Sequence, residues 1–181
     1  MKDKDDIMNI SKIVVGELQT NCYLIEKNNE CLLIDPGAEY LKIKDFIRDK
    51  NVIGILITHS HFDHIGCVKD LVNDYNIPVY DDNNLKEGIN HISTFNIAVI
   101  KTYGHTMDSI SFYFKETKVM FTGDFLFYDT IGRCDFSESN YEELKKSIKK
   151  IKGYSNDIVV YPGHGIETTL GREKMMNIYF R

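Results

Sequence analysis

The sequence lacks the features that mark membrane and nucleic-acid-binding proteins. No apolar run approaches the roughly 20 residues that a membrane-spanning helix needs. The formal net charge is −5, from 22 basic and 27 acidic residues. This balance disfavours nucleic acid as a partner, because neutralising phosphates requires concentrated lysine and arginine. The charged segment Met1–Asp6 contains no apolar stretch of the kind found in signal peptides. We therefore expect a cytoplasmic protein without membrane contact.

Cysteine pairs with metal or redox spacing are also absent. The chain has four cysteines and no C-x-x-C pair. A turn at Asn28–Asn29 would place Cys31 opposite about residue 26 rather than opposite Cys22. We expect no disulfide and reduced thiols. A ligand role for Cys134 stays open from the sequence.

The chain contains no repeat, no low-complexity stretch and no linker rich in proline and glycine. Its 181 residues suit one domain that is large enough to bury a substantial core. We therefore expect residues 1–181 to form a single domain. The sequence does not predict an oligomeric state.

Short apolar runs of strand length recur along the chain. Val52–Ile57 is continuously apolar, as expected for a strand buried on both faces. Further strands are expected at 13–15, 22–25, 31–34, 78–80, 97–100, 110–114, 119–121 and 158–161, and helices at about 39–50, 64–75, 82–90 and 140–152. The mixture predicts a protein of the α/β class, in which 110–114 and 119–121 pair as a hairpin.

In four places a hydrophobic strand ends in a loop that carries histidine or aspartate. The first loop is Thr58–His64, and the other three contain His105, Asp124 and His164, each beside a glycine. Rigid strands fix such loops, and polar side chains at the ends of neighbouring strands converge. A helix cap or a hydrogen-bonded loop residue is the alternative for each isolated position. We interpret the four loops as one site, and we interpret His91, which lacks this context, as an ordinary histidine.

The H-x-H-x-D-H pattern of the first loop indicates metal binding, since histidine and aspartate cost free energy when buried without partners. In an extended segment His59 and His61 project to the same side and can share one ion. Asp63 and His64 can converge only if the chain turns, and the residues after Gly66 indicate a helix that begins near residue 64. The motif therefore divides into halves that could serve two ions. A cluster of solvated histidines is the alternative.

Five segments together resemble the metallo-β-lactamase superfamily, and more narrowly its glyoxalase II (hydroxyacylglutathione hydrolase) branch. The segments are 58–64, 104–106, 122–127, 132–135 and 162–165. The resemblance implies a four-layer αββα sandwich with a dinuclear site along one edge of the sheets. It implies that one ion is bound by His59, His61 and His105, that the second is bound by Asp63, His64 and His164, and that Asp124 bridges both. Zinc is expected, with iron or manganese as alternatives.

The resemblance also implies a mechanism. Two ions held about 3.5–4 Å apart can share a water and lower its pKa, which gives a bridging hydroxide as nucleophile. Asp63 is expected to help orient this hydroxide, and Arg133 lies where the branch places a basic substrate-contacting residue. The expected activity is hydrolysis of a small-molecule thioester.

The chain departs from the family pattern at Cys67, Asp108 and Asp135. In addition, only seventeen residues follow His164, enough for one closing helix, where full-length glyoxalase II continues into a helical domain that helps to bind glutathione. The chain therefore resembles the short, single-domain glyoxalase II-like hydrolases. Two alternatives remain: an oxidoreductase resembling the persulfide dioxygenases, with a single iron held by two histidines and an aspartate, and a metal-binding protein without catalysis.

Overall fold

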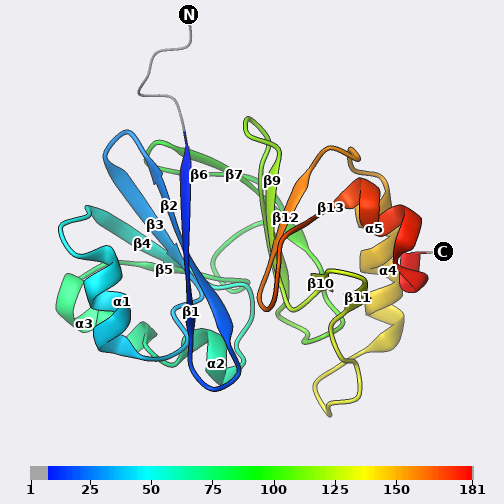
Figure 1. Cartoon of the computed structure of the whole chain (residues 1–181), viewed down its shortest axis with the longest axis horizontal. Coiled ribbons are helices and arrows are strands. Elements are labelled where there is room, and N and C mark those ends of the chain that lie inside the picture. Colours follow the sequence, from blue (N-terminus) through cyan, green and yellow to red (C-terminus); the bar gives the residue numbers. More distant parts are fainter. Residues whose placement is uncertain (1–7, 181) are drawn as a thin grey trace, which may run out of the picture.

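The computed structural model describes residues 8–180, so the charged segment Met1–Asp6 lies outside the described residues. Two β-sheets face each other in the middle of the molecule, and helices lie on their outer sides (Figure 1). The strand order is β1-β2-β3-β4-β5 in the first sheet and β13-β12-β9-β8-β7-β6 in the second. The expected αββα sandwich is confirmed.

The first sheet combines antiparallel and parallel strands: β1, β2 and β3 are antiparallel, whereas β3, β4 and β5 are parallel. Its elements are β1 (Asn9–Val15), β2 (Thr20–Lys27), β3 (Glu30–Ile34), α1 (Tyr40–Ile47), β4 (Val52–Leu56), α2 (Phe62–Ile65), α3 (Val68–Tyr75) and β5 (Val79–Tyr80). Cys31 lies opposite Glu26, as the turn at Asn28–Asn29 predicted, and the four cysteines are free.

The second sheet is antiparallel except where β12 runs parallel to β9. It consists of β6 (Gly88–Ile92), β7 (Phe95–Lys101), β8 (Ile110–Phe114), β9 (Val119–Gly123), β12 (Val159–Pro162) and β13 (Thr168–Thr169), and it is accompanied by the ribbon β10 (Leu126–Phe127) and β11 (Thr130–Ile131), helices α4 (Tyr141–Lys152) and α5 (Leu170–Met176), and the 3₁₀ turn η2 (Ile178–Phe180). Within residues 8–180, no helix is long and apolar enough to cross a membrane.

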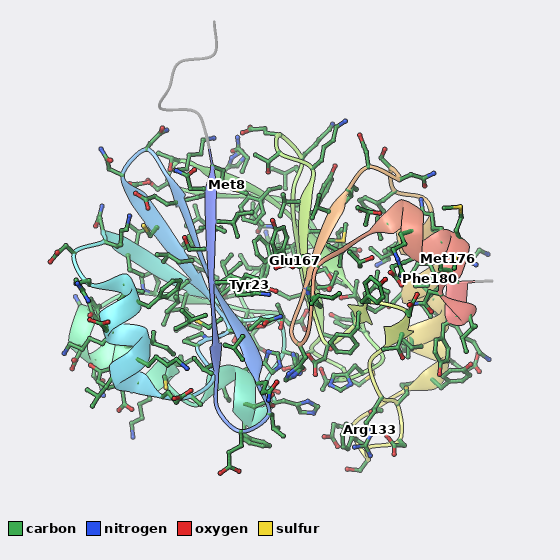
Figure 2. The ribbon with its side chains drawn as sticks, in the orientation of Figure 1. Met8, Tyr23, Arg133, Glu167, Met176 and Phe180 are labelled. Carbon is green, nitrogen blue, oxygen red and sulfur yellow. The ribbon has the colours of Figure 1, made fainter. Side chains whose placement is uncertain are left out.

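Alternate residues of the central strands serve two apolar layers. Ile25 of β2 packs between the sheets, whereas its neighbour Leu24 belongs to the layer beneath α1 and α3. Tyr23 also lies between the sheets, near the centre of the molecule (Figure 2). A third layer, which includes Leu144 and Ile148, joins α4 to the second sheet. Because both faces of each sheet are covered, polar side chains of a site must lie at the ends of the strands.

Two predicted helices require correction. Residues 82–90 do not form a helix: a turn leads into β6, and the side chain of Asn90 bonds to the backbone of Lys86. Such local bonds compete with helix formation. The helix expected over 64–75 is divided into α2 and α3, because the Cys67 N–H donates to the Pro36 carbonyl, 2.9 Å away. The ribbon β10–β11 and strand β13 were not predicted.

Candidate metal centre

The four loops predicted to converge do so, and they bring seven side chains into two adjacent groups. The first group contains His59, His61, His105 and Asp124, and the second contains Asp63, His64 and His164. Within each group, one nitrogen or oxygen atom of every residue lies within 4.8 Å of those of the others. α2 carries Asp63 and His64, and it lies at the lower end of the molecule in Figure 1.

Three imidazole rings face one another in the first group. Nδ1 of His61 lies 3.0 Å from Nε2 of His105. The ring of His59 is edge-on to both, with centroids 4.7 Å from that of His61 and 5.1 Å from that of His105. The strand-end loops thus direct ring nitrogens of three histidines toward one point.

The carboxylate of Asp124 lies between the two groups. Its Oδ1 is 3.3 Å from Nε2 of His64, and its Oδ2 is 3.4 Å from Nε2 of His164 and 3.7 Å from Nε2 of His105. Oδ2 of Asp63 completes the second group, at 3.5 Å from His64 and 3.3 Å from His164. Asp124 therefore faces both groups with its two oxygens.

The buried carboxylate of Asp35 orders two of the histidines, and the sequence analysis missed it. It accepts hydrogen bonds from Nδ1 of His64 at 2.9 Å and from the Thr58 hydroxyl at 2.6 Å. Because that hydroxyl proton is used, the Thr58 oxygen accepts from Nδ1 of His59, 3.1 Å away. In both rings Nδ1 donates to an outer partner, so Nε2 is the nitrogen that faces the two groups. Asp35 directly follows strand β3, so the strand-end rule used for the other loops could have found it.

The other histidines are oriented in the same way. Nδ1 of His105 donates to the Arg133 carbonyl at 2.8 Å, and Nδ1 of His164 donates to the Leu18 carbonyl at 3.0 Å. Nε2 of His61 lies 3.3 Å from a carboxylate oxygen of Glu138, which leaves Nδ1 for the first group. An outer partner of this kind fixes which ring nitrogen can bind a metal.

Three buried polar atoms of the centre have no hydrogen-bond partner in the described chain: Nε2 of His59, Nε2 of His64 and Oδ1 of Asp124. Nearly all buried polar groups in proteins are paired, so orphaned atoms that face one another need another partner. Imidazole and carboxylate are ligands that suit zinc, iron and manganese. The residues therefore fit a dinuclear metal centre.

The electrostatics of the centre favour positive charge. Burial opposes protonation of His64, but Asp35 and Asp124 outweigh burial and raise its pKa to about 10. Burial also opposes the charge of His164, whose pKa is raised to about 10 by its hydrogen bonds with Asp124 and Asp63. Burial disfavours ionisation of Asp124, yet His164 and His64 hold its pKa well below the usual range. The carboxylates therefore attract cations to the centre.

Glycines allow the loops to approach closely. A Cβ atom at Gly163 would lie 2.2 Å from Oδ1 of Asp124 and 2.8 Å from Cε1 of His64. Gly104, next to His105, has φ +138°, and a Cβ atom there would lie 2.4 Å from the Cα atom of Leu144. Larger residues at either position would displace the ligand-bearing loops.

A pocket of about 570 Å³ opens beside the centre. Its apolar walls are formed by Leu18, Phe62, Phe127, Ile131 and Phe136. Arg133 also lines the pocket.

Tyr23, from the opposite sheet, donates to the Pro162 carbonyl at 2.7 Å and so helps to hold the loop that carries His164.

Four other positions singled out by the sequence are not among the seven side chains. Cys134 donates to the Gly104 carbonyl at 3.2 Å and packs against the α4 layer. Cys67 is buried directly before α3, and Asp108 accepts from the Thr106 hydroxyl at 2.6 Å. His91 is exposed and contacts Asn96, as expected for an ordinary histidine.

Comparisons with known proteins agree with the fold. A family model described as the metallo-beta-lactamase superfamily matches residues 15–83 and 80–164. The hydroxyacylglutathione hydrolase GloC of Haemophilus influenzae is 34% identical over 207 residues, which cover 94% of this chain and 97% of that protein.

Two solved structures are similar along almost their whole length. The structure of the BLEG-1 B3 metallo-beta-lactamase has a TM-score of 0.89 and 29% identity, and covers 95% of this chain and 99% of its own. The di-iron-bound form of TTHA1623 has a TM-score of 0.86 and 31% identity, and covers 93% of this chain and 99% of its own.

Proposed function

The chain belongs to the metallo-beta-lactamase superfamily, and we propose that it is a dinuclear metal-dependent hydrolase that acts on a small thioester. The observation that carries this proposal is the convergence of seven ligand atoms in two groups, three of them buried without a partner in the described chain. A chain that only needed stability would not bury so many polar groups at one end of its strands.

We assign to the residues the roles expected from the sequence, and the two groups support this assignment. His59, His61 and His105 would hold one ion, Asp63, His64 and His164 the other, and Asp124 would bridge both, because its oxygens face both groups. Bound ions would supply Lewis acidity, which polarises a carbonyl and lowers the pKa of water. The hydroxyl of Thr20 donates to Oδ2 of Asp63 at 2.7 Å and so fixes the carboxylate that would orient the attacking water.

The pocket supports a small substrate. Its apolar walls would shield the reacting carbonyl from bulk water, which strengthens the electrostatic interactions within the site. The Cys134 thiol donates to a backbone carbonyl, so it does not offer a side-chain nucleophile. The similarity to GloC over nearly the full length supports a thioester as the substrate class.

Zinc is the metal that we propose, since a mixed histidine and carboxylate site suits it. The similarity to a structure described as di-iron-bound supports iron as the alternative. Elemental analysis of protein purified without added metal would distinguish the two. We expect about two ions per chain, and a single iron per chain would favour the oxidoreductase alternative.

The experiment that tests the proposed function is the initial rate of S-lactoylglutathione hydrolysis by the metal-loaded protein, with a chelated sample as control. Turnover that the chelator abolishes would support a metal-dependent thioesterase. If neither S-lactoylglutathione nor the lactoyl thioester of an uncharged thiol is hydrolysed, the proposed function is wrong. Oxygen consumption with persulfide substrates would then test the alternative.

A further inference from the structure

One wall of the pocket is the segment between β11 and α4, which carries Arg133 at the lower end of the molecule (Figure 2). Among the described residues that line the pocket, Arg133 is the one lysine or arginine. Its carbonyl holds Nδ1 of His105, so the start of this segment is fixed to the metal centre.

One carboxylate-binding edge of Arg133, formed by Nε and Nη2, is already occupied. Nε and Nη2 donate to the two oxygens of Asp135 at 2.9 and 2.8 Å. This parallel, two-bond contact is the one that a substrate carboxylate would make with an arginine. One face of the guanidinium lies over Phe136, with Cζ 4.6 Å from the ring centroid. Phe136 in turn packs edge-on against His61 and His105, at 5.4 and 5.8 Å between centroids.

The charges around this part of the pocket do not favour an anion. Asp135 cancels the charge of Arg133, and Glu138 adds a carboxylate whose Oε1 lies 3.3 Å from Nε2 of His61. The adjoining surface is apolar: the side chains of Leu18 and Phe62 line the pocket and are 54% and 73% exposed. An uncharged group would lose fewer favourable interactions with water on entering such a site than a carboxylate would.

We propose that Asp135 is a specificity-determining residue, which makes the pocket select thioesters of uncharged thiols over thioesters of thiols that bear carboxylates, such as glutathione. This inference rests on the proposed function, because it names the carrier part of the same substrate. Asp135 pairs with Arg133 within the chain, so the positive charge of Arg133 is compensated and does not attract a substrate anion. The paired guanidinium group stacks on Phe136 and forms an uncharged part of the pocket lining.

The test compares two substrates with the same acyl group, S-lactoylglutathione and S-lactoyl-N-acetylcysteamine, which differ only in the thiol carrier. The quantity measured is the ratio of kcat/KM for the glutathione thioester to kcat/KM for the N-acetylcysteamine thioester. Asp135→Asn should raise this ratio about fivefold, the size expected when an exposed ion pair no longer competes for Arg133. The double variant D135N/R133Q should return the ratio to that of the wild type.

The chain offers a matched control. Arg172 also makes a two-bond contact with a nearby aspartate: its Nη1 and Nη2 donate to Asp129 at 2.7 and 2.9 Å, and its guanidinium stacks on Tyr128. Neither Arg172 nor Asp129 lines the pocket. Asp129→Asn should leave the ratio unchanged. Circular dichroism and metal content should be equal for all variants compared.

Two results would overturn the proposal. The first is a ratio for D135N that stays equal to that of the wild type, and the second is a lower ratio for Arg133→Gln alone, which would mean that Arg133 binds glutathione despite Asp135. If the wild type hydrolyses neither thioester, the proposed function fails separately. Calorimetric binding of glutathione and of N-acetylcysteamine to the wild type and D135N then tests the same preference without turnover, and equal glutathione affinities would refute it.

Discussion

The carboxylate of Asp35 lies 2.9 Å from Nδ1 of His64, and both side chains are buried. This contact joins the end of β3 to α2, so the first sheet itself sets the orientation of a predicted metal ligand. Asp35 also accepts from the N–H and the hydroxyl of Thr58, which leads on to His59. One carboxylate therefore connects the two halves of the H-x-H-x-D-H motif.

Asp35→Asn should weaken binding of the second ion about ten- to a hundredfold, the usual effect of losing an outer partner of a metal-bound histidine. An amide nitrogen facing Nδ1 of His64 cannot accept its proton, so the ring would lose the tautomer that leaves Nε2 free. Titration of metal-free protein against a competing chelator measures this affinity. Asp129→Asn is the control. Unchanged affinities for both ions would contradict the role assigned to Asp35.

Asp124→Ala should abolish turnover, with a loss greater than the roughly hundredfold produced by removing an outer partner alone. Asp124 faces both groups, so its removal should also lower the metal content of the purified protein. The fold should persist, because the three apolar layers do not include this residue. Kinetic assays, elemental analysis and circular dichroism check the three parts, and retained activity would refute the bridging role.

Gly163→Ala should disrupt metal binding, because its Cβ would lie 2.2 Å from Oδ1 of Asp124. Gly165→Ala is a matched control two residues away: its φ is +76°, and a Cβ atom there would point into open space, with nothing described within 4 Å. We expect the control to lose about 1 kcal/mol of unfolding free energy, from left-handed backbone strain, and to keep its metal. Denaturant unfolding and elemental analysis compare the two. Equal metal content in both variants would contradict the steric argument.

The cysteines should react slowly with thiol reagents in the native protein. Burial raises the pKa of Cys22, Cys31 and Cys67, so little thiolate forms at neutral pH and access is restricted. Burial also raises the pKa of Cys134, but that side chain is partly exposed. At a pH of about 7.5 a disulfide reagent should label Cys134 at most, and all four thiols after unfolding. Rapid labelling of all four cysteines in the native state would contradict this expectation and would show that the apolar layer beneath α1 and α3 opens readily.

Local sequence patterns predicted most of the sheet framework, because strands buried on both faces leave continuous apolar runs such as Val52–Ile57. The hairpin of β8 and β9 and the register of Cys31 opposite Glu26 followed from turn positions. Residues 82–90 were predicted wrongly, since side-chain bonds to the backbone and β6 pairing with β7 outweigh local helix propensity. The two-residue strands of the ribbon β10–β11 are too short to leave a periodic signal.

The sequence by itself determined which residues could bind metal, because residue type decides which side chains can act as ligands. The spacing of the ligands in the first motif separated His59 and His61 from Asp63 and His64. The tertiary structure decided how those ligands are oriented and what the pocket can accept. A strand-end position could have pointed to Asp35, but the contacts of Asp35 with His64 and of Glu138 with His61 join residues that are distant in sequence, and the two bonds of Asp135 with Arg133 depend on side-chain geometry. Hydrogen-bond direction depends on atoms brought within about 3 Å, and only the packed chain sets those distances.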